Sequence, residues 1–576
     1  MTAQHPYQDA TLAVDQRVED LLSRMALEDK AGLLFQQLAS VGDFEAPGLF
    51  GSSSVRELLD QGLTHFNILF APSAREIAQW HNAMQDEARK HPLGIPVTIS
   101  SDPRHSFTDN PATALLAGPF TQFPESLGLA AIGSEELVTR FAELTRREYL
   151  AVGIRTALHP QIDLATEPRW ARQSATFGED AALTTRLGVA YIKGLQAGTE
   201  IGPESVSVMA KHFPGGGPQL NGEDPHFAYG REQIYPGGQF DLHLEPFKAA
   251  VEAGVGQMMP YYGMPVGLDG IEEVGFGFNK DIITGLLRDK LGYDGIVCTD
   301  WGILSRTFWG VEDLTYEQRM VKSLDAGVDQ FGGEYRADIL VSLVKNDTIS
   351  EQRLDTSVRR LLREKFRLGL FDNPYVDAGR AEAIVGTAGA KAEGLAAQAA
   401  AHTLLTNAED GPARLPLARG LKIYAEGLAA EAVGARGELV ATPAEADVAI
   451  LKLQAPFEQR GDGTTIESFF RAGSLAFPHD EIERIQRITE AVPTVVDVYL
   501  DRPAILADIA GSAASLVVNF GASDEATVQV LFGAARPQGR LPFDIPSSMA
   551  AVEASRPDVP FDTADPTFRF GHGLTY

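Results

Sequence analysis

Charged and aromatic side chains follow several short apolar runs in the first half of the chain. Carboxylate, guanidinium, amine and imidazole groups can hydrogen-bond the many hydroxyls of a sugar, and a tryptophan beside them offers a flat apolar surface to a pyranose ring. These residues are Asp102, Arg169, Arg172, Lys211, His212, Tyr261, Asp300 and Trp301. Each alone also has a structural interpretation, because an Asp after a strand often caps the next helix and an Arg often forms a surface ion pair.

A parallel sheet covered by helices would bring these residues to one edge. Between about residues 65 and 370, short apolar and β-branched runs alternate with amphipathic helical stretches, which is typical of such a sheet. The runs cover residues 95–100, 154–158, 206–210, 257–259, 295–299 and 328–331. Roughly eight units fit this span, so we predict an α/β fold of the (β/α)8 barrel type, whose reactive groups lie at the carboxyl ends of the strands. An open doubly wound sheet is the alternative.

The second half of the chain is predicted to be a smaller α/β domain. A helix over residues 350–371 ends the first half, and Pro374 follows it. Strand-like runs then cover residues 421–424, 447–453, 494–500 and 515–520, with helices over 480–491 and 525–534. We therefore expect a barrel-type domain over residues 1–372, a linker over 373–400 and an α/β sandwich domain over 401–576.

The composition limits the classes of partner and of compartment. The 576 residues carry a formal net charge of −29, which disfavours nucleic acid and anionic membranes because both are polyanions. The single cysteine, Cys298, excludes an intrachain disulfide framework and a cysteine-based zinc site. The chain starts without a secretory signal pattern and has no membrane-spanning apolar run. We expect a soluble, cytoplasmic protein that binds a neutral or cationic ligand, and a homo-oligomer is possible.

Other catalytic patterns have less support in the sequence. Gly215, Gly216 and Gly217 lie between two prolines and lack the Gly-Lys-Ser/Thr of a phosphate loop, so we interpret them as a loop that lets backbone approach a substrate. There is no Gly-x-Ser-x-Gly elbow and no His-Glu-x-x-His motif. The 12 histidines show no metal-ligand spacing, so we expect neither a metal nor a cofactor.

A series of motifs in register resembles glycoside hydrolase family 3. The series begins with RVEDLLSRM at 17–25 and EDK at 28–30, and continues with EPRWAR at 167–172, KHFP at 211–214 and TDW at 299–301. It extends into the second half through LDRP at 500–503, GRLPF at 539–543 and FGHGLTY at 570–576. The resemblance covers nearly the whole chain. It implies a barrel-type first domain, an α/β sandwich second domain and a covalent glycosyl-enzyme intermediate.

The resemblance also implies roles for individual residues. Asp300 matches the nucleophile of the family. The residues that match those holding the hydroxyls of the terminal sugar, or lying beside it, are Asp102, Arg172, Lys211, His212, Met258 and Tyr261. A carboxylate near Lys and Arg charges stays ionised at neutral pH, so it can attack an anomeric carbon and stabilise an oxocarbenium-like transition state.

The acid that protonates the leaving oxygen has more than one candidate. Glu458, in the segment APFEQRGD at 455–462, matches the acid of the β-glucosidase branch, and Glu467 is a weaker competitor in the same loop. Asp224 and His226 resemble the Asp-x-His pair of the N-acetylglucosaminidase branch, although Gly216 replaces a histidine usual there. The structural interpretation is an ion pair of Glu458 with Arg460 and a hydrogen bond between His226 and Asp224.

These motifs together predict a retaining, exo-acting β-glycosidase, with β-glucosidase as the leading activity. Its substrate would be a β-linked oligosaccharide or a glucoside, cleaved at the non-reducing end. A β-N-acetylglucosaminidase or β-xylosidase of the same fold is the first alternative, because contacts outside the motifs decide the substituents at C2 and C5. A catalytically silent carbohydrate-binding protein is the alternative from another class.

Overall fold

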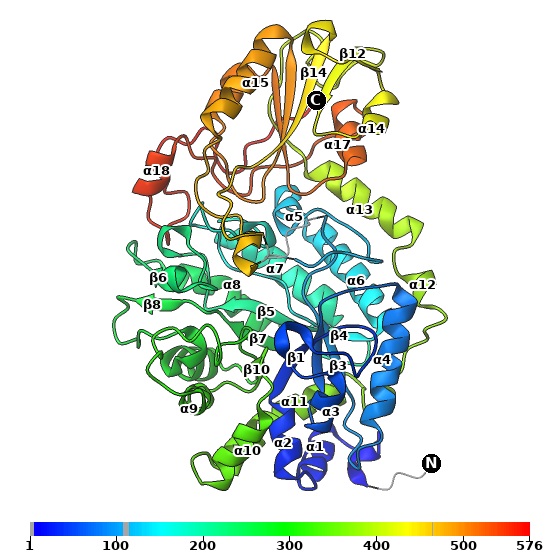
Figure 1. Cartoon of the computed structure of the whole chain (residues 1–576), viewed down its shortest axis with the longest axis vertical. Coiled ribbons are helices and arrows are strands. Elements are labelled where there is room, and N and C mark those ends of the chain that lie inside the picture. The colour runs from blue at the N-terminus through cyan, green and yellow to red at the C-terminus, as the bar shows by residue number, and fades with distance from the viewer. Residues whose placement is uncertain (1–4, 108–113, 464) are drawn as a thin grey trace.

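The protein is described by a computed structural model that covers residues 5–107, 114–463 and 465–576. Figure 1 shows two domains, one coloured blue to green and the other yellow to red, with the second packed on one end of the first. No helix within these ranges is long and apolar enough to cross a membrane.

Eight parallel strands form the main sheet of the first domain, and β6 (Glu232–Ile234) pairs with β8 (Met264–Val266) in a separate small sheet. In spatial order the eight strands of the main sheet are β10 (Phe331–Gly332), β1 (Phe35–Ala39), β2 (His65–Ile68), β3 (Thr98–Ser101), β4 (Ile154–Ala157), β5 (Ser207–Phe213), β7 (Gln257–Pro260) and β9 (Ile296–Val297). The sheet closes because Cys298, after β9, pairs in parallel with Gln330, before β10, and the Thr299 amide donates to the Gln330 carbonyl at 2.9 Å. The predicted (β/α)8 barrel is therefore confirmed, and the open sheet is excluded.

Helices follow the strands and cover the barrel wall. They are α3 (Val55–Asp60), α4 (Ala74–Ala88), α5 (Ser126–Ile132), α6 (Glu135–Val152), α7 (Ala181–Gln196), α8 (Phe240–Glu252), the π-helix η7 (Asp281–Lys290), α9 (Tyr316–Ala326), α10 (Ala337–Lys345) and α11 (Glu351–Arg367). Two helices precede β1, namely α1 (Val14–Leu22) and α2 (Leu27–Leu33), and both pack on α11. Local signals fix the ends of α6, since the Ser134 hydroxyl accepts from the Leu137 amide and Gly153 at φ 87° ends the helix.

The second domain is a six-stranded sheet with helices on both faces. The strand order is β11 (Thr403–Thr406), β16 (Ser515–Asn519), β15 (Thr494–Tyr499), β14 (Val448–Gln454), β12 (Lys422–Glu426) and β13 (Glu438–Leu439), and only β11 is antiparallel. Alternate residues of β15 enter two separate apolar clusters, Val496 and Val498 in one and Val495 in the other. The predicted α/β sandwich is confirmed. Its helices are α14 (Ala430–Gly434), α15 (His479–Ala491), α16 (Ala507–Ser512), α17 (Asp524–Leu531) and α18 (Met549–Ala554).

Polar contacts and one long helix join the two domains. The segment 373–400, predicted as a linker, contains α12 (Ala381–Ile384) and most of α13 (Ala388–Ala401), and α13 packs on both α5 and α17. The buried Glu179 accepts the backbone amides of Asp544 and Phe561 at 2.7 Å each. The Asp558 carboxylate accepts the Gly237 amide at 2.8 Å. Buried bonds of this kind fix how the second domain sits on the barrel.

Candidate functional site

The carboxyl ends of the barrel strands gather a group of buried charges. Asp102 directly follows β3, and its Oδ1 lies 2.9 Å from the Nζ of Lys211, which is part of β5. The Asn67 amide of β2 donates to Asp102 Oδ2 at 3.0 Å. Burial alone would raise the pKa of Asp102, but the charge of Lys211 and these hydrogen bonds outweigh it and lower that pKa. Asp102 is therefore ionised. Its ion pair with Lys211 faces the mouth of the barrel, which is the opening at the carboxyl ends of the strands.

His212 is the next residue of β5, and its ring is held by Asp163. Its Nδ1 lies 2.8 Å from Asp163 Oδ2, and the amides of His212 and Gly216 donate to Asp163 Oδ1. Because a carboxylate accepts, Nδ1 is assigned as the donor, which leaves Nε2 turned to the mouth. Burial, helped by the charges of Arg172 and Lys211, lowers the pKa of His212 well below its ordinary value. The imidazole is therefore neutral. Burial also raises the pKa of Asp163 to about 7.

Asp300 follows β9 and offers one carboxylate oxygen to the site. Its Oδ1 accepts the Trp301 amide at 2.7 Å. Its Oδ2 is buried and has no hydrogen-bond partner in the described parts of the chain, and His212 Nε2 lies 3.8 Å from it. The group is thus held by one oxygen and directed into the site by the other, as a nucleophile or a ligand-binding carboxylate requires.

Trp301 lies half-buried beside Asp300, and its indole packs against the backbone of Gly332 and Gly333. A Cβ added at Gly332 or Gly333 would come within 2.8 Å or 2.7 Å of its indole, and Gly333 has φ 69°. The Tyr262 hydroxyl donates to the Trp301 carbonyl at 2.7 Å. Gly332 ends β10 and Gly333 follows it, and the absence of a side chain at both is what leaves room for the indole.

Asp224 joins the remaining aromatic and basic groups of the mouth. Its Oδ2 accepts from the Trp170 indole and the Tyr261 hydroxyl at 3.0 Å each, and its Oδ1 lies 2.6 Å from Nδ1 of His226. Burial would raise the pKa of Asp224, but His226 and Arg172 outweigh it and lower that pKa. The predicted Asp224–His226 pair therefore exists, and Asp224 also fixes the Tyr261 ring.

Arg172 lies among the charged side chains at the mouth, whereas Met258 lies in the barrel core. The Arg172 guanidinium lies over the Tyr261 ring at 5.8 Å, and its Nε is buried with no partner in the described ranges. Burial would lower the pKa of Arg172, but Tyr261, Asp224 and Asp300 raise it. Met258 is an interior residue of β7 and is part of the barrel core. Of these two, Arg172 is the side chain in the charged group.

The second domain reaches this mouth through the loop at residues 455–474. In Figure 1 this yellow-orange loop extends from the second domain onto the barrel. Arg460 forms a bidentate ion pair with Glu223 of the barrel. Phe470 packs with Phe227 and Ala171 of the barrel. The Phe470 ring also lies 4.8 Å from the His226 ring. Segments far apart in sequence thus form one surface around the mouth.

Glu458 lies on this loop, with its side chain folded back onto it. Its Oε1 accepts the Ser474 amide at 3.0 Å, and its Oε2 lies 3.5 Å from Arg460. The side chain is 54% exposed. Glu467 instead accepts from the Tyr229 hydroxyl of the barrel. In this conformation Glu458 accepts a hydrogen bond from its own loop and Glu467 accepts one from the barrel. Within the ranges described, neither carboxylate makes a hydrogen bond with Asp300.

Arg502 ties the base of the loop to the barrel, and we had not predicted a role for it. It is fully buried, and its two terminal nitrogens donate to five backbone carbonyls. Four of these belong to the loop, at Pro456, Ala472, Gly473 and Ser474, and the fifth is Arg169 of the barrel, at 2.9 Å. Burial lowers the pKa of Arg502 to about 10, so it remains a cation at neutral pH. It holds both arms of the loop on the barrel.

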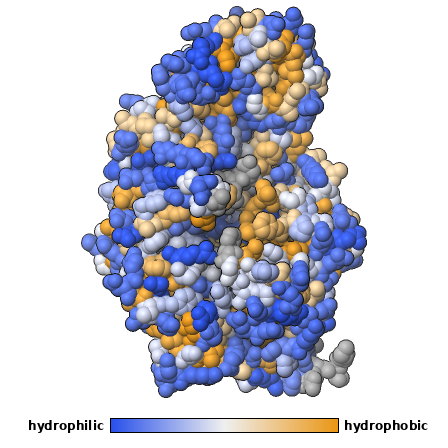
Figure 2. All heavy atoms as spheres, viewed as in Figure 1, coloured by the Kyte–Doolittle hydropathy of each residue, from blue (hydrophilic) through white to orange (hydrophobic). Residues whose placement is uncertain are grey.

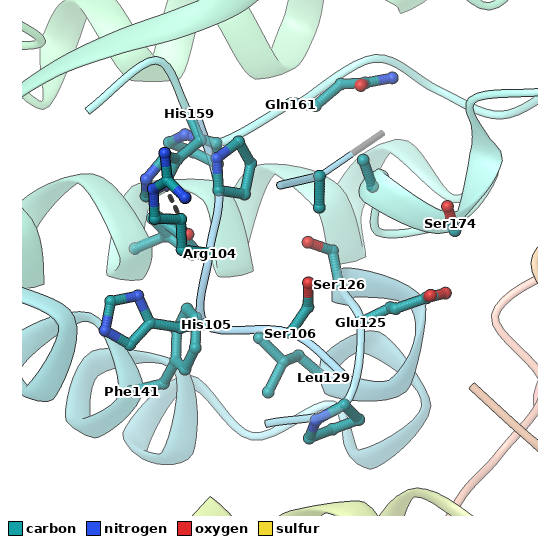
Figure 3. A pocket seen from close by; sticks show the side chains of 16 residues that line it. Arg104, His105, Ser106, Glu125, Ser126, Leu129, Phe141, His159, Gln161 and Ser174 are labelled. Carbon is teal, nitrogen blue, oxygen red and sulfur yellow. Dashed lines mark hydrogen bonds between the residues drawn. The ribbon is translucent and has the colours of Figure 1, made fainter. Parts of the chain in front are cut away.

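Two other cavities lie in the first domain, away from this group of charges. One cavity, of about 30 Å³, has Arg104, Ser106, Gln161 and Ser174 around it, as Figure 3 shows. That volume suits water rather than a sugar. A cavity of about 470 Å³ lies where β5, β7 and β9 begin, and its Arg360 and Arg363 are paired with Asp294. Within the described residues, no group of three or more His, Cys, Asp or Glu could hold a metal ion.

Two family models match the chain. The model described as "Glycosyl hydrolase family 3 N terminal domain" matches residues 43–364, and "Glycosyl hydrolase family 3 C-terminal domain" matches residues 313–576. β-Glucosidase C of Emericella nidulans is 50% identical over 99% of this chain and 94% of its own length. A periplasmic β-glucosidase/β-xylosidase of Dickeya chrysanthemi is 39% identical over 99% of this chain and 92% of its own.

Solved structures share the architecture. A β-glucosidase from Erythrobacter marinus superposes with a TM-score of 0.84 at 22% identity, covering 100% of this chain and 84% of that one. A β-glucosidase from Listeria innocua in complex with isofagomine gives 0.79 at 23% identity, over 97% and 83%. At these identities the likeness shows the fold.

Proposed function

Since this chain belongs to glycosyl hydrolase family 3, we propose that it is a retaining, exo-acting β-glucosidase whose nucleophile is Asp300. The observation that carries the proposal is the free Oδ2 of Asp300, which is buried beside His212 and Arg172 at the barrel mouth. Asp102, Lys211, Arg172 and the Nε2 of neutral His212 would hydrogen-bond the hydroxyls of the terminal glucosyl unit, with Trp301 against its ring. Relatives named β-glucosidase support this substrate.

In the proposed reaction, Asp300 and a loop acid act in two displacements. In the first, Asp300 Oδ2 bonds to the anomeric carbon while the bond to the leaving oxygen breaks and Glu458 gives that oxygen a proton. In the second, water attacks the anomeric carbon, Glu458 takes its proton, and the bond to Asp300 breaks. Both steps invert the anomeric centre, so its configuration is retained. The two carboxyl groups must then lie roughly 5–5.5 Å apart, which requires Glu458 to leave Ser474 and turn toward the mouth.

The Asp224–His226 pair supports a second assignment of the acid. His226 is bonded to Asp224 at 2.6 Å and lies beside Tyr262 at 4.5 Å, so it is already at the mouth. If His226 were the acid, a β-N-acetylglucosaminidase would be the better proposal. The Dickeya relative, named for two activities, supports β-xyloside cleavage as a side activity. Rates on aryl glucoside, xyloside and N-acetylglucosaminide, measured in Glu458→Gln and His226→Gln, separate these cases.

Azide rescue tests the two roles directly. In Asp300→Gly, azide can occupy the space of the carboxylate and displace an activated leaving group once, so we expect an α-glucosyl azide. In Glu458→Ala, azide replaces water in the second displacement, so we expect a β-glucosyl azide. Without azide, Asp300→Asn should lose several powers of ten in kcat, and the exposed Asp269→Asn should lose nothing. Retention of activity in Asp300→Asn, or sugar binding without turnover by the parent, would refute the proposal.

A further inference from the structure

The proposed reaction assigns no role to Tyr262, a buried side chain of the mouth. Tyr262 comes two residues after β7, the strand that neighbours β9 in the barrel. Figure 2 shows the molecular surface hollowed in the middle of one face, and Tyr262 adds almost nothing to the surface because it is 2% exposed. Burial raises the pKa of its hydroxyl well above the ordinary value, and the nearby charge of Asp300 raises it further. The hydroxyl therefore keeps its proton and can donate a hydrogen bond.

This hydroxyl holds the segment that carries the proposed nucleophile. Residues 299–302 follow β9, which lies between β7 and β10 in the closed barrel. On the β10 side, the Gly302 amide donates to the Gly332 carbonyl at 2.9 Å. On the β7 side, the Tyr262 hydroxyl donates to the Trp301 carbonyl at 2.7 Å. The segment is therefore fixed from both neighbouring strands.

The carboxylate of Asp300 depends on Trp301 for its orientation. Its Oδ1 accepts the Trp301 amide at 2.7 Å, while its Oδ2 has no hydrogen-bond partner in the described ranges. Trp301 thus holds the carboxylate through its amide, and Tyr262 holds Trp301 through its carbonyl. The amide and the carbonyl flank one Cα atom and are linked by two soft dihedrals. A rotation of the carbonyl therefore moves the amide that fixes Asp300.

His226 fixes the ring of Tyr262 in turn. The two rings meet edge to face, with centroids 4.5 Å apart and an interplanar angle of 67°. His226 is itself held by Asp224, whose Oδ1 lies 2.6 Å from its Nδ1, and the Phe470 ring packs on it at 4.8 Å. This packing restricts the phenol, so its hydroxyl is preorganised toward the Trp301 carbonyl.

A buried tyrosine hydroxyl can also do no more than satisfy a backbone carbonyl. Tyr293 has this arrangement, since it is 5% exposed and its hydroxyl donates to the Gly256 carbonyl at 2.9 Å. It lies where β7 and β9 begin, at the end of the barrel opposite the mouth. Tyr262 differs in the carbonyl that it holds, because that carbonyl belongs to the residue that anchors Asp300.

We propose that Tyr262 is a positioning residue for the nucleophile, which acts through the backbone of Trp301 to aim the free oxygen of Asp300 at the anomeric carbon. This inference rests on the proposed function. Loss of the hydroxyl leaves the Trp301 carbonyl without this donor, so the carbonyl turns toward another one. A misplacement of about 1 Å at the reacting atoms costs up to about 10²-fold in rate. The chemical step should therefore suffer, whereas binding of the sugar should not.

Covalent trapping measures the attack of the nucleophile by itself. The reagent is a dinitrophenyl β-glucoside with fluorine in place of the C2 hydroxyl, which forms the glycosyl-enzyme bond and hydrolyses slowly. Its leaving group needs no acid. In Tyr262→Phe, which keeps the ring beside His226, we expect the inactivation rate at saturation to fall by about 10–100-fold. The half-saturating concentration should change by less than about threefold, because the residues that hold the sugar are untouched.

Tyr293→Phe is the matched control, since it removes the same hydroxyl from a backbone carbonyl outside the mouth. It should lower the midpoint of urea unfolding, as Tyr262→Phe does, but be trapped as fast as the parent. Three results overturn the inference: trapping of Tyr262→Phe within about threefold of the parent rate, an equal loss in Tyr293→Phe, or a loss that lies in the half-saturating concentration. A parent that is not trapped, or that carries the sugar on a residue other than Asp300 in peptide mapping, refutes the proposed function itself.

Discussion

Replacement of Arg502 by methionine should impair acid assistance while sparing the nucleophile. The change keeps much of the volume of the side chain but removes every donor to the five carbonyls at Pro456, Arg169, Ala472, Gly473 and Ser474. Each hydrogen bond from a charged donor is worth roughly 1.5–3 kcal/mol, and carbonyls near the surface recover part of this from water. We therefore expect the free energy that holds the loop on the barrel to fall by about 3 kcal/mol. This change lowers the population of the docked loop by up to about 10²-fold.

The assay uses two glucosides that differ in their need for a proton. Dinitrophenolate leaves without protonation, whereas phenolate or methoxide needs the acid, whose contribution is about 10²–10⁴-fold. We expect kcat/KM of Arg502→Met to fall by about 10²-fold on phenyl β-glucoside and by less than about threefold on the dinitrophenyl glucoside. Arg502→Lys, which keeps the charge and some donors, should lie between.

An equal loss on both substrates would refute this reasoning, because it would mean that Arg502 supports the whole site rather than the acid. The same conclusion would follow if Glu458→Gln lowered activity on top of Arg502→Met by its full single-variant factor. Urea unfolding of each variant provides the check that the fold persists.

Three other changes test separate parts of the structure. Asp163→Asn turns an amide toward the donors that the carboxylate accepted, so His212 should lose its orientation and kcat/KM should fall by about 10–100-fold in a glucoside assay. Gly333→Ala forces a Cβ against Trp301 at positive φ, and should lower stability by about 1–3 kcal/mol in urea unfolding and shift the tryptophan fluorescence. Burial lowers the pKa of His243 to about 4. This pKa lies below the unfolded value of about 6.5. The neutral His243 therefore contributes at most about 3 kcal/mol to the free energy of unfolding above about pH 6.5, and this contribution is lost as the pH falls toward 4. His243→Gln should therefore flatten the acid limb of the stability curve.

The strands of the barrel could be predicted where the chain is apolar on both sides of the sheet. The predicted runs at 154–158 and 257–259 correspond closely to β4 and β7. The prediction missed β1 (Phe35–Ala39) and β2 (His65–Ile68). One residue separates β1 from α2, and its two glutamines continue a helical pattern, while β2 alternates polar and apolar residues over only four positions. Closure of the barrel decided both, and closure is a long-range property.

The site could be predicted in part. Asp102 and Asp300 follow strands and Lys211 lies in the second half of β5, and the fold brings those positions together. Asp163 was missed because it lies in an irregular run after β4, where no periodic signal marks it. Arg502 was missed because its acceptors are carbonyls, which every residue type provides. The roles of Glu458 and His226 remain predictions, as do the cytoplasmic location and the possible homo-oligomer.

The split of the mouth between two domains has a consequence for synthesis. Ribosomes release the chain from its N-terminus, so the barrel, through α11, emerges well before residues 455–474. Until then Ala171 and Phe227 lack the apolar cover that Phe470 provides, and the Arg169 carbonyl lacks the Arg502 guanidinium. The nascent barrel therefore exposes this apolar surface until the second domain has been translated. Holdase chaperones that bind exposed apolar surface should associate with ribosome-bound chains in that interval and leave once the second domain has folded.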